Sequence, residues 1–284
     1  MLTNRKKMIS FRRGDILEDG EAMASLLRET FDQSIFTKDF LTWKHCQNPA
    51  GSSFVLLAEE DSKLVGLRMF MLWDFSIEGK EYKAIRPVDT AVHKEYQGKG
   101  LFKKLTLQGL EMMKGNYDFI FNTPNNNSLP GYLKMGWTKI NSPVVFYFTP
   151  VLFSLRKVKF TREKKVDGSG KNAAFANWRY SPPRYHWAHF PDQSVIIYRV
   201  EKRRFFNLVI VVDTFFTTEN LKQNVHSICS REKASGYIFL YSNKTRALKS
   251  FASLKRQTPV IVSKEASGIL DNYDFSLGDV EGIL

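Results

Sequence analysis

Cysteine is scarce in this chain of 284 residues, which has only Cys46 and Cys229, far apart in the sequence. A disulfide-rich scaffold needs several cysteines in a small extracellular domain, and a zinc site needs ligands at short, regular spacing. The sequence shows neither pattern. It therefore predicts two reduced thiols and no metal site.

Long hydrophobic runs are missing as well. No apolar stretch approaches the roughly 20 residues that a membrane-spanning helix needs. The first residues, MLTNRKKMISFRRGD, are basic, but no apolar segment follows them as it would in a secretory signal. We therefore expect a cytoplasmic protein without a membrane span.

Acidic residues are outnumbered: 42 Lys and Arg against 29 Asp and Glu give a net charge of +13. Residues 1–150 have a net charge of +3, whereas residues 151–284, with 22 basic against 12 acidic side chains, have +10. Such an excess suits an anionic substrate, a nucleic acid or a membrane surface, and an ordinary solvated basic surface shows it too. Composition alone leaves these alternatives open.

The rest of the composition, 43% hydrophobic and 25% charged, is that of a globular protein with room for two modest domains. Periodicity and turn signals predict strands over 8–13, 53–58, 63–75, 84–92 and 119–121, helices over 18–31, 38–45 and 101–114, and a short helix ending at Gly136. Strands over 137–140 and 144–148 are expected to form a hairpin. We predict a mixed α/β domain over 1–150 and a basic linker over 151–174.

Residues 175–284 repeat the first domain in a degenerate form. Four pairs of segments match in the same order: 40–45 with 175–180, Pro49 with Pro183, Arg68 with Arg199, and 88–90 with 212–214. The stretch after Thr214, FFTTENLKQN, contains no glycine, whereas the stretch after Thr90 contains Gly98 and Gly100. The second copy is expected to keep the scaffold and to lack this turn.

The turn Gln97-Gly98-Lys99-Gly100 lies between a strand and a helix. Glycines let the backbone approach an anion, and the first amides of a helix have no partner within it. The helix dipole also favours negative charge at this end. The turn therefore predicts a phosphate-binding site.

Two further motifs follow the turn in order. The strand over 119–121 leads into an Asn-rich loop, and the loop leads into Tyr132-Leu-Lys-Met-Gly-Trp137. Together the three features resemble the GNAT superfamily of acyl-CoA-dependent N-acetyltransferases, whose motifs are Q/R-x-x-G-x-G/A, then N-x-x-A and Y-x-K-x-G-F. The resemblance covers most of residues 8–148. It implies a GNAT fold, a central mixed sheet flanked by helices, followed by a second GNAT-like domain on the acceptor side.

The resemblance also implies acetyl-CoA as co-substrate. The turn would hold its pyrophosphate, the strand edge its pantetheine, and the Asn loop the cofactor arm. The residues so implied are Thr90, Ala91, Val92, Gln97, Gly98, Lys99, Gly100, Leu101, Phe102, Asn125 and Ser128. Phe102 and Ser128 depart from the motifs, which have Gly or Ala at the first position and Ala at the second. For Asn125, an Asx turn within the loop is the alternative.

Chemistry in this superfamily is direct attack of a neutral amine on the thioester, so neither cysteine would act. The resemblance implies Tyr132 as the acid that protonates the departing thiolate; a core aromatic with a satisfied hydroxyl is the alternative. Some members use a strand carboxylate as base, but this chain has Arg86 at that position, which leaves the nearby Asp89 as candidate. Asp213 occupies the equivalent place in the copy without the turn, which favours a structural role for Asp89. Alternative bases are His45, His93 and Glu59.

These observations predict an N-acetyltransferase acting on a small primary amine. Pro124–Ser128 with the Gly-Trp ending is similar to a bacterial branch associated with surface-polysaccharide biosynthesis, which implies an amino sugar or a nucleotide-linked amino sugar. A tandem transferase using aminoacyl-tRNA and a non-catalytic CoA-binding module are the alternatives. A nucleic-acid partner is not expected, and the oligomeric state stays open, with a dimer as one alternative.

Overall fold

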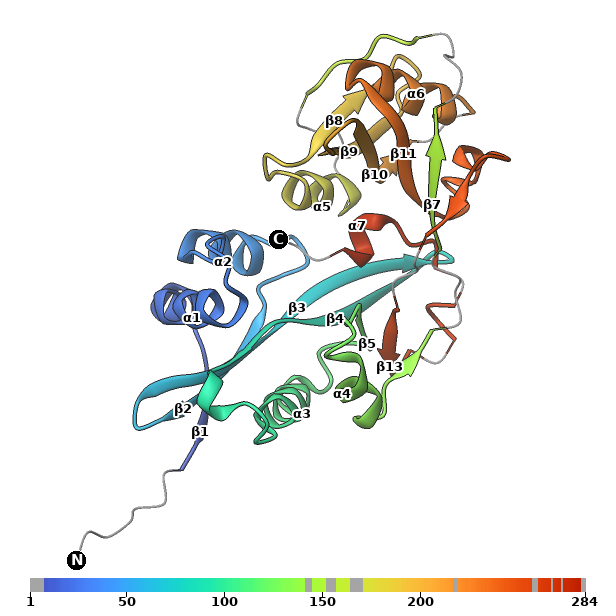
Figure 1. The fold of residues 1–284 in the computed structure, drawn as a ribbon. Coiled ribbons are helices and arrows are strands. Elements are labelled where there is room, and N and C mark those ends of the chain that lie inside the picture. Colours follow the sequence, from blue (N-terminus) through green and yellow to red (C-terminus); the bar gives the residue numbers. More distant parts are fainter. Residues whose placement is uncertain are drawn as a thin grey trace, which may run out of the picture. The chain divides into compact units, whose positions relative to one another are not determined.

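The computed structural model describes residues 8–140, 145–151, 157–163, 171–216, 219–256, 260–266, 268–271 and 273–281. The chain forms two compact units (Figure 1). The first takes the residues up to Lys139 and the segment 262–269, and the second takes the residues 140–261 and 270–281. Both are mixed α/β, as the fold class predicted. Within the described part of the chain, no helix has the length and apolar character needed to cross a membrane.

The first unit is built on a seven-stranded sheet. In spatial order its strands are β1 (Ser10–Arg13), β2 (Phe54–Glu60), β3 (Lys63–Ile77), β4 (Lys80–Val92), β5 (Phe119–Asn122), β13 (Val262–Lys264) and β6 (Thr138–Lys139). Only β4 and β5 run parallel; the other neighbours are antiparallel. A parallel pair needs a crossover connection, and the helix after the glycine turn supplies it.

Helices cover both faces of this sheet. Helices α1 (Ile16–Phe31) and α2 (Lys38–Cys46) lie on one face, and α3 (Leu101–Met113) and α4 (Leu129–Lys134) lie on the other (Figure 1). Thr37 caps α2, as predicted, by accepting a hydrogen bond from the Phe40 amide at 3.1 Å. Leu27 and Leu41 pack with Leu57 and Met69 in the core under α1 and α2.

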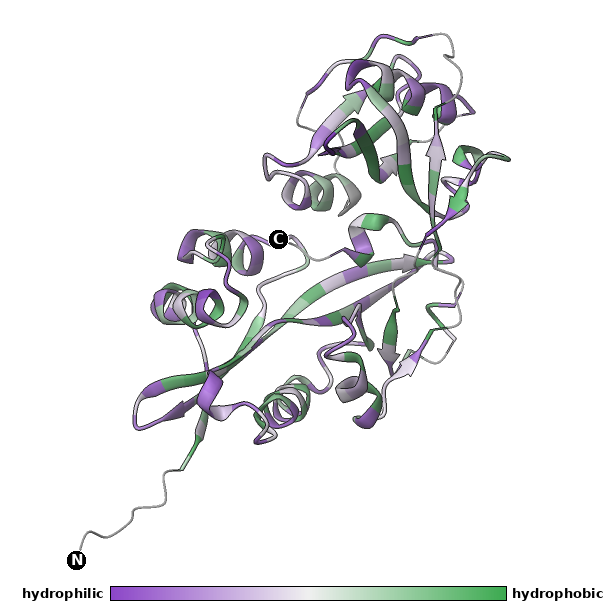
Figure 2. Cartoon of the chain, viewed as in Figure 1, coloured by the Kyte–Doolittle hydropathy of each residue, from purple (hydrophilic) through white to green (hydrophobic). Residues whose placement is uncertain are grey.

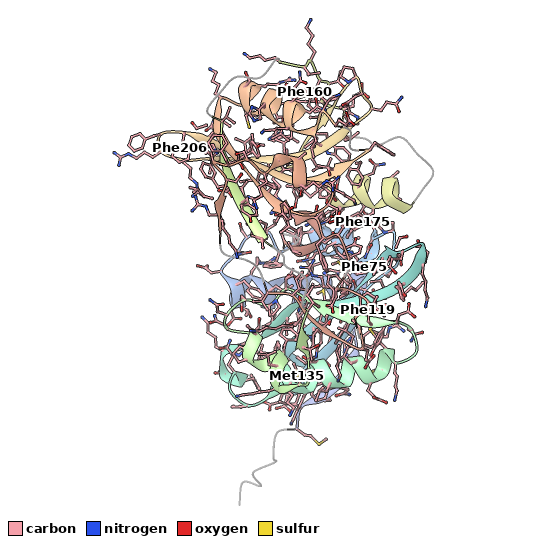
Figure 3. The ribbon with its side chains drawn as sticks, turned by 90° about the vertical axis from the view of Figure 1, so that its right-hand side faces the viewer. Phe75, Phe119, Met135, Phe160, Phe175 and Phe206 are labelled. Carbon is pink, nitrogen blue, oxygen red and sulfur yellow. The ribbon has the colours of Figure 1, made fainter. Side chains whose placement is uncertain are left out.

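Aromatic side chains fill the interior of the same sheet. The rings of Phe75 and Phe119, both labelled in Figure 3, lie 5.3 Å apart, and both residues are buried. Phe75 also meets Phe121 edge to face at 5.0 Å. These contacts join the long strand β3 to the short strand β5 across β4.

The second unit has a six-stranded sheet. In spatial order its strands are β12 (Leu254–Lys255), β7 (Val145–Pro150), β11 (Ala234–Tyr241), β10 (Asn207–Phe215), β9 (Val195–Lys202) and β8 (His186–His189); its helices are α5 (Lys171–Arg179), α6 (Leu221–Arg231) and α7 (Leu277–Val280). Figure 2 shows β10 as hydrophobic over most of its length, and its side chains at Val209 and Val211 pack against α6.

The second sheet repeats the topology of the first. Strands β8 to β11 follow the order of β2 to β5, and β10 and β11 form the parallel pair, with α6 as crossover. A contact is repeated too: the His45 ring lies 2.8 Å from the Asp89 carboxylate, and the Tyr180 hydroxyl donates to Asp213 at 2.7 Å. The predicted correspondence of 40–45 with 175–180 and of Asp89 with Asp213 thus has a structural counterpart.

One expected correspondence is wrong. Arg68 lies opposite the irregularity in β4 at Asp89, whereas in the second sheet Ile197 lies opposite Asp213. Arg199 lies two residues further along, opposite Ile210. The match of Arg68 with Arg199 rested on residue type at the end of an apolar run, and the strand register overrules it.

The expected hairpin of 137–140 with 144–148 is also wrong. Strand β7 pairs instead with β11 and β12, and β13, from near the other end of the chain, pairs between β5 and β6. Strand β6 has only two residues, whereas β7 pairs all six of its residues with β11. The six-residue pairing of β7 with β11 is therefore favoured over a hairpin of β7 with β6, its neighbour in sequence. Of the predicted linker, Val158 and Phe160 pack against the core of the second unit.

Candidate functional site

A β-bulge interrupts the pairing of β3 with β4. Leu67 pairs with Ala91 and Met69 with Val88, so Arg68 alone faces both Asp89 and Thr90. Asp89 takes a left-handed backbone conformation, with φ 44°. Bulges of this kind redirect side chains and are frequent beside active sites. Here the bulge sends Asp89 and Arg68 into different surroundings.

The parallel ladder of β4 and β5 ends early. It pairs Ala84 with Phe119 and Ile85 with Ile120, so among the described strands none pairs with the edge of β4 at Thr90–Val92 on this side. Beyond the ladder, the side-chain amide of Asn122 donates to the Pro87 carbonyl at 2.8 Å. A free strand edge can accept an added extended ligand through its backbone groups.

Tyr132, the predicted acid, lies beside this edge and is 3% exposed. Its hydroxyl oxygen accepts hydrogen bonds from Arg68 Nη2 at 2.7 Å and Asn122 Nδ2 at 2.5 Å. With two donors on the oxygen, the hydroxyl's own proton is directed away from Arg68 and Asn122. This geometry fits both interpretations, a proton donor and a core aromatic with a satisfied hydroxyl, and the catalytic role of Tyr132 stays a prediction.

Arg68 is the central side chain of this cluster and is fully buried. Its Nη1 donates to the Thr90 hydroxyl at 2.9 Å, and its guanidinium lies 4.8 Å above the ring of Phe102. Phe102 in turn meets Tyr132 edge to face at 5.8 Å. The motif has Gly or Ala where this chain has Phe102. The structure gives a local reason for this departure, because the Phe102 ring covers the buried guanidinium of Arg68.

Sequence reasoning missed Arg68 and Asn122 as site residues. An arginine inside the apolar run Val65–Met71 was the available signal for Arg68, because a charge in a buried strand needs a partner or a task. For Asn122 the signal was weaker, since Asn125, three residues later, matched the motif better.

The glycine turn is built as the sequence predicted. A short 3₁₀ helix, η1 (Lys94–Tyr96), precedes it, and Gly98 and Gly100 have φ of 74° and 78°. A side chain at either glycine would meet nothing within 4 Å, which leaves open space above the backbone. The first helical bond runs from the Lys104 amide to the Gly100 carbonyl, so the preceding amides have no partner within α3.

These features fit a phosphate group. Open space, amides without a partner in α3 and the positive end of a helix coincide, and Lys99, Lys103 and Lys104 are exposed around them. Gln97 fastens the turn to the strand by donating to the Val92 carbonyl at 3.0 Å, while Leu101 is buried and fixes the helix end. Ala91, also buried, anchors the strand.

Asn125 and Ser128 are held together in the loop before α4. The Asn125 side-chain oxygen accepts from the amides of Asn127 and Ser128, at 3.1 and 2.9 Å, and from the Ser128 hydroxyl at 3.0 Å. This is the Asx turn that stood as the alternative interpretation. A contact of either residue with a cofactor stays a prediction.

Asp89 lies in a buried ion pair. Its carboxylate is 2.7 Å from Lys44 Nζ and 2.8 Å from His45 Nε2, and His45 Nδ1 lies 2.8 Å from the Ser53 hydroxyl. Burial alone would raise the pKa of Asp89, but Lys44 and His45 outweigh it and hold this pKa well below its usual range. Burial lowers the pKa of His45, against the opposing effect of Asp89.

The other candidate bases, Glu59 and His93, have partners of their own. Glu59 is paired with Arg12 at 2.7 Å, and His93 accepts from the Glu95 amide at its Nδ1. Arg86 is buried, donates to the Thr123 hydroxyl at 2.6 Å, and lies between the rings of Trp73 and Phe121. Across the described ranges, no group of three or more His, Cys, Asp or Glu side chains could hold a metal ion.

Comparison with known proteins relates the first unit to a family. Residues 17–140 match the family model described as "Acetyltransferase (GNAT) domain". No sequence relative was found among curated proteins.

Solved structures share the fold over most of the chain. A GCN5-related N-acetyltransferase from Anabaena variabilis is similar at a TM-score of 0.69 and 12% identity, over 90% of this chain and 72% of its own. A probable N-acyltransferase from Enterococcus faecalis is similar at a TM-score of 0.68 and 13% identity, over 93% of this chain and 73% of its own. A glucosamine N-acetyltransferase region of a fungal multi-domain β-N-acetylglucosaminidase is similar at a TM-score of 0.56 and 10% identity. The match covers 91% of this chain and 38% of that one.

Proposed function

We propose that this chain, whose residues 17–140 are a GNAT acetyltransferase domain and which is thereby an acyltransferase, moves an acetyl group from acetyl-CoA to a primary amine. The proposed acceptor is an amino sugar or a nucleotide-linked amino sugar, and the proposed setting is polysaccharide biosynthesis in the cytoplasm. The similarity of Pro124–Ser128 to a polysaccharide-associated branch supports this acceptor. So does the glucosamine acetyltransferase region among the structures of the same fold.

The observation that carries the proposal is the hydroxyl of Tyr132. Arg68 and Asn122 hold it beside the free edge of β4, with its proton directed away from both donors. Acetyl transfer to an amine releases a thiolate, which needs a proton, and a positioned phenol can supply it. The buried guanidinium of Arg68 would stabilise negative charge that develops at this place.

The binding half of the site would be the glycine turn. Amides from Gly98 to Phe102 would hold the pyrophosphate of acetyl-CoA, and the edge at Thr90–Val92 would pair with the pantetheine amides. Asp89 stays a predicted base, but its ion pair and lowered pKa make it a weak one. The equivalent contact of Asp213 in the second unit supports a structural role instead.

Release of free thiol from acetyl-CoA tests the proposal across amino sugars, sugar nucleotides, polyamines and amino acids. Release with an amino sugar or a nucleotide-linked amino sugar supports it. CoA binding without release from any amine would favour the non-catalytic module. Salt-dependent binding to the acceptor end of tRNA, without CoA binding, would favour the aminoacyl-tRNA alternative.

Calorimetric titration with CoA tests the turn itself. Gly100→Asp should abolish binding, because a carboxylate would occupy the space above the amides and repel phosphate. Gly79→Asp is the matched control: Gly79 has φ of 79°, open space around it, and a place in the β3–β4 hairpin turn. Equal affinity of the two variants would contradict the proposed site.

A further inference from the structure

The hairpin of β9 and β10 ends in an exposed tip of four residues, Arg203-Arg204-Phe205-Phe206. Lys202 pairs with Asn207, and the Arg203 amide donates to the Phe206 carbonyl at 2.8 Å, which closes the turn. Phe205 is 83% exposed and Phe206 is 45% exposed. Figure 3 shows Phe206 at the outer margin of this unit. Two adjacent phenyl rings are therefore held out on a hydrogen-bonded hairpin.

Turn chemistry does not explain this sequence. Tight hairpin tips favour Gly, Asn and Asp where the turn needs a positive φ, but no residue from Arg203 to Phe206 takes one, so the backbone leaves the choice of these four side chains open. The tip contains no Gly, Asn or Asp. Exposure of two phenyl rings to water is unfavourable, so their presence at a tip indicates a surface that covers them.

The charges beside the rings are positive. Lys202, Arg203 and Arg204 are consecutive and exposed, and the Arg204 guanidinium lies 5.1 Å from the centre of the Phe205 ring. The nearest acid in sequence, Glu201, is already paired with Arg199 at 2.9 Å and Arg203 at 2.5 Å. The tip thus combines exposed aromatic rings with cationic groups.

A third exposed phenylalanine, Phe251, lies at the same end of the sheet. Gly236 pairs with Pro150 and Leu208 with Glu201, which places the end of β7 level with the base of the tip. Strand β12 starts beside β7 at Leu254, so the loop before it, with Phe251 at 95% exposure, lies toward this end. Lys249 and Lys255 flank that loop residue in sequence.

We infer that this end of the second unit, with the tip at Arg203–Phe206 as its main contact, docks on the surface of a membrane that contains anionic lipid. Phenyl rings enter the interface between headgroups and acyl chains, while arginine and lysine bind lipid phosphates. A nucleic acid fits the tip less well, because Arg204 already covers one side of the Phe205 ring on which a base would stack. Docking of this kind is peripheral and reversible.

Vesicle flotation with the full chain tests the inference. The vesicles are phosphatidylcholine alone, or equal parts of phosphatidylcholine and phosphatidylglycerol. Wild type should float with the mixed vesicles only, and added salt should weaken this binding. The double variant Phe205→Ser/Phe206→Ser should bind weaker by about tenfold for each ring removed. Phe216→Ser is the control, since Phe216 is 63% exposed and follows the opposite end of β10.

Phe205→Trp adds a direct readout. Its fluorescence should shift to the blue with mixed vesicles and stay unchanged with phosphatidylcholine. Absence of wild-type flotation, or equal flotation of wild type and the double serine variant, would overturn the inference. Binding to single-stranded RNA, or self-association in sedimentation, that the double variant loses while vesicles have no effect would also overturn it and assign the tip to that partner.

Discussion

Replacement of Asp89 by asparagine should destabilise the protein strongly without removing the chemistry. Asp89→Asn keeps the shape of the side chain but leaves the Lys44 ammonium, 3% exposed, without its counter-charge. Loss of one partner of a buried pair typically costs about 3–5 kcal/mol, because the remaining charge stays desolvated. We expect the free energy of unfolding in urea to fall by about this amount.

A second variant separates charge from geometry. Lys44→Met in the Asp89→Asn background removes the stranded ammonium and puts a side chain of similar length in its place. Most of the lost stability should return, because an apolar replacement of a buried ion pair is often neutral. The two single changes should therefore be far from additive.

The pH dependence of the free energy of unfolding is an independent test of the stabilising role of Asp89. The pKa of Asp89 in the folded chain lies below its unfolded value, so its contribution is present above about pH 4 and is lost as the pH falls through the folded pKa. The lowered pKa of His45 acts in the same direction below about pH 6.5. Wild type should therefore lose stability more steeply in acid than the Asp89→Asn/Lys44→Met variant.

One combination of results would assign Asp89 to catalysis instead of to stability. If Asp89→Asn unfolds at the same urea concentration as wild type and kcat falls by about a hundredfold or more, the carboxylate acts as the general base. Thiol-release kinetics and urea unfolding on the same preparation distinguish the two roles. A loss of stability with a kcat near wild type supports the structural role.

Three further changes test the Tyr132 cluster. Tyr132→Phe should lower kcat by about 10²–10⁴ with little change in KM for acetyl-CoA, and a kcat within about threefold of wild type would exclude Tyr132 as the acid. Arg68→Met should lower kcat by about a hundredfold but leave urea stability unchanged or higher, because the described residues offer Arg68 no carboxylate; Arg68→Lys should recover only part of the rate. Asn122→Ala should cost about 1–3 kcal/mol of stability, measured by thermal unfolding, since the Pro87 carbonyl loses its donor.

Local patterns predicted the local structure well. Thr37 signals the start of α2, and Gly98 and Gly100 signal the turn, because a side-chain cap and a positive φ are properties of a few adjacent residues. The parallel pair on either side of α3 follows from the order of elements. The GNAT fold could therefore be predicted from the motifs within residues 8–148.

The polar cluster around Tyr132 could not be predicted from the sequence in the same way. Arg68, Asn122 and Tyr132 are 10 to 64 positions apart, and they meet only because a bulge in β4 sets the register and the β4–β5 ladder stops at Ile85. Neither feature has a local sequence signal. The same holds for Asp89, whose residue type suggested a base and whose surroundings became known only with the α2 contacts.

The position of β13 in the first sheet has a consequence for folding during synthesis and for truncation of the chain. Strand β13 completes the first sheet but is translated some 140 residues after β5, its partner at Asn122–Val262. Until then β5 and β6 have open edges, and such edges invite pairing with other chains. A fragment that stops near residue 140 would keep the turn and Tyr132 but lack the strand between β5 and β6. Because this pair is long-range in sequence, we expect the two edges to stay open to such pairing until synthesis of the chain is complete.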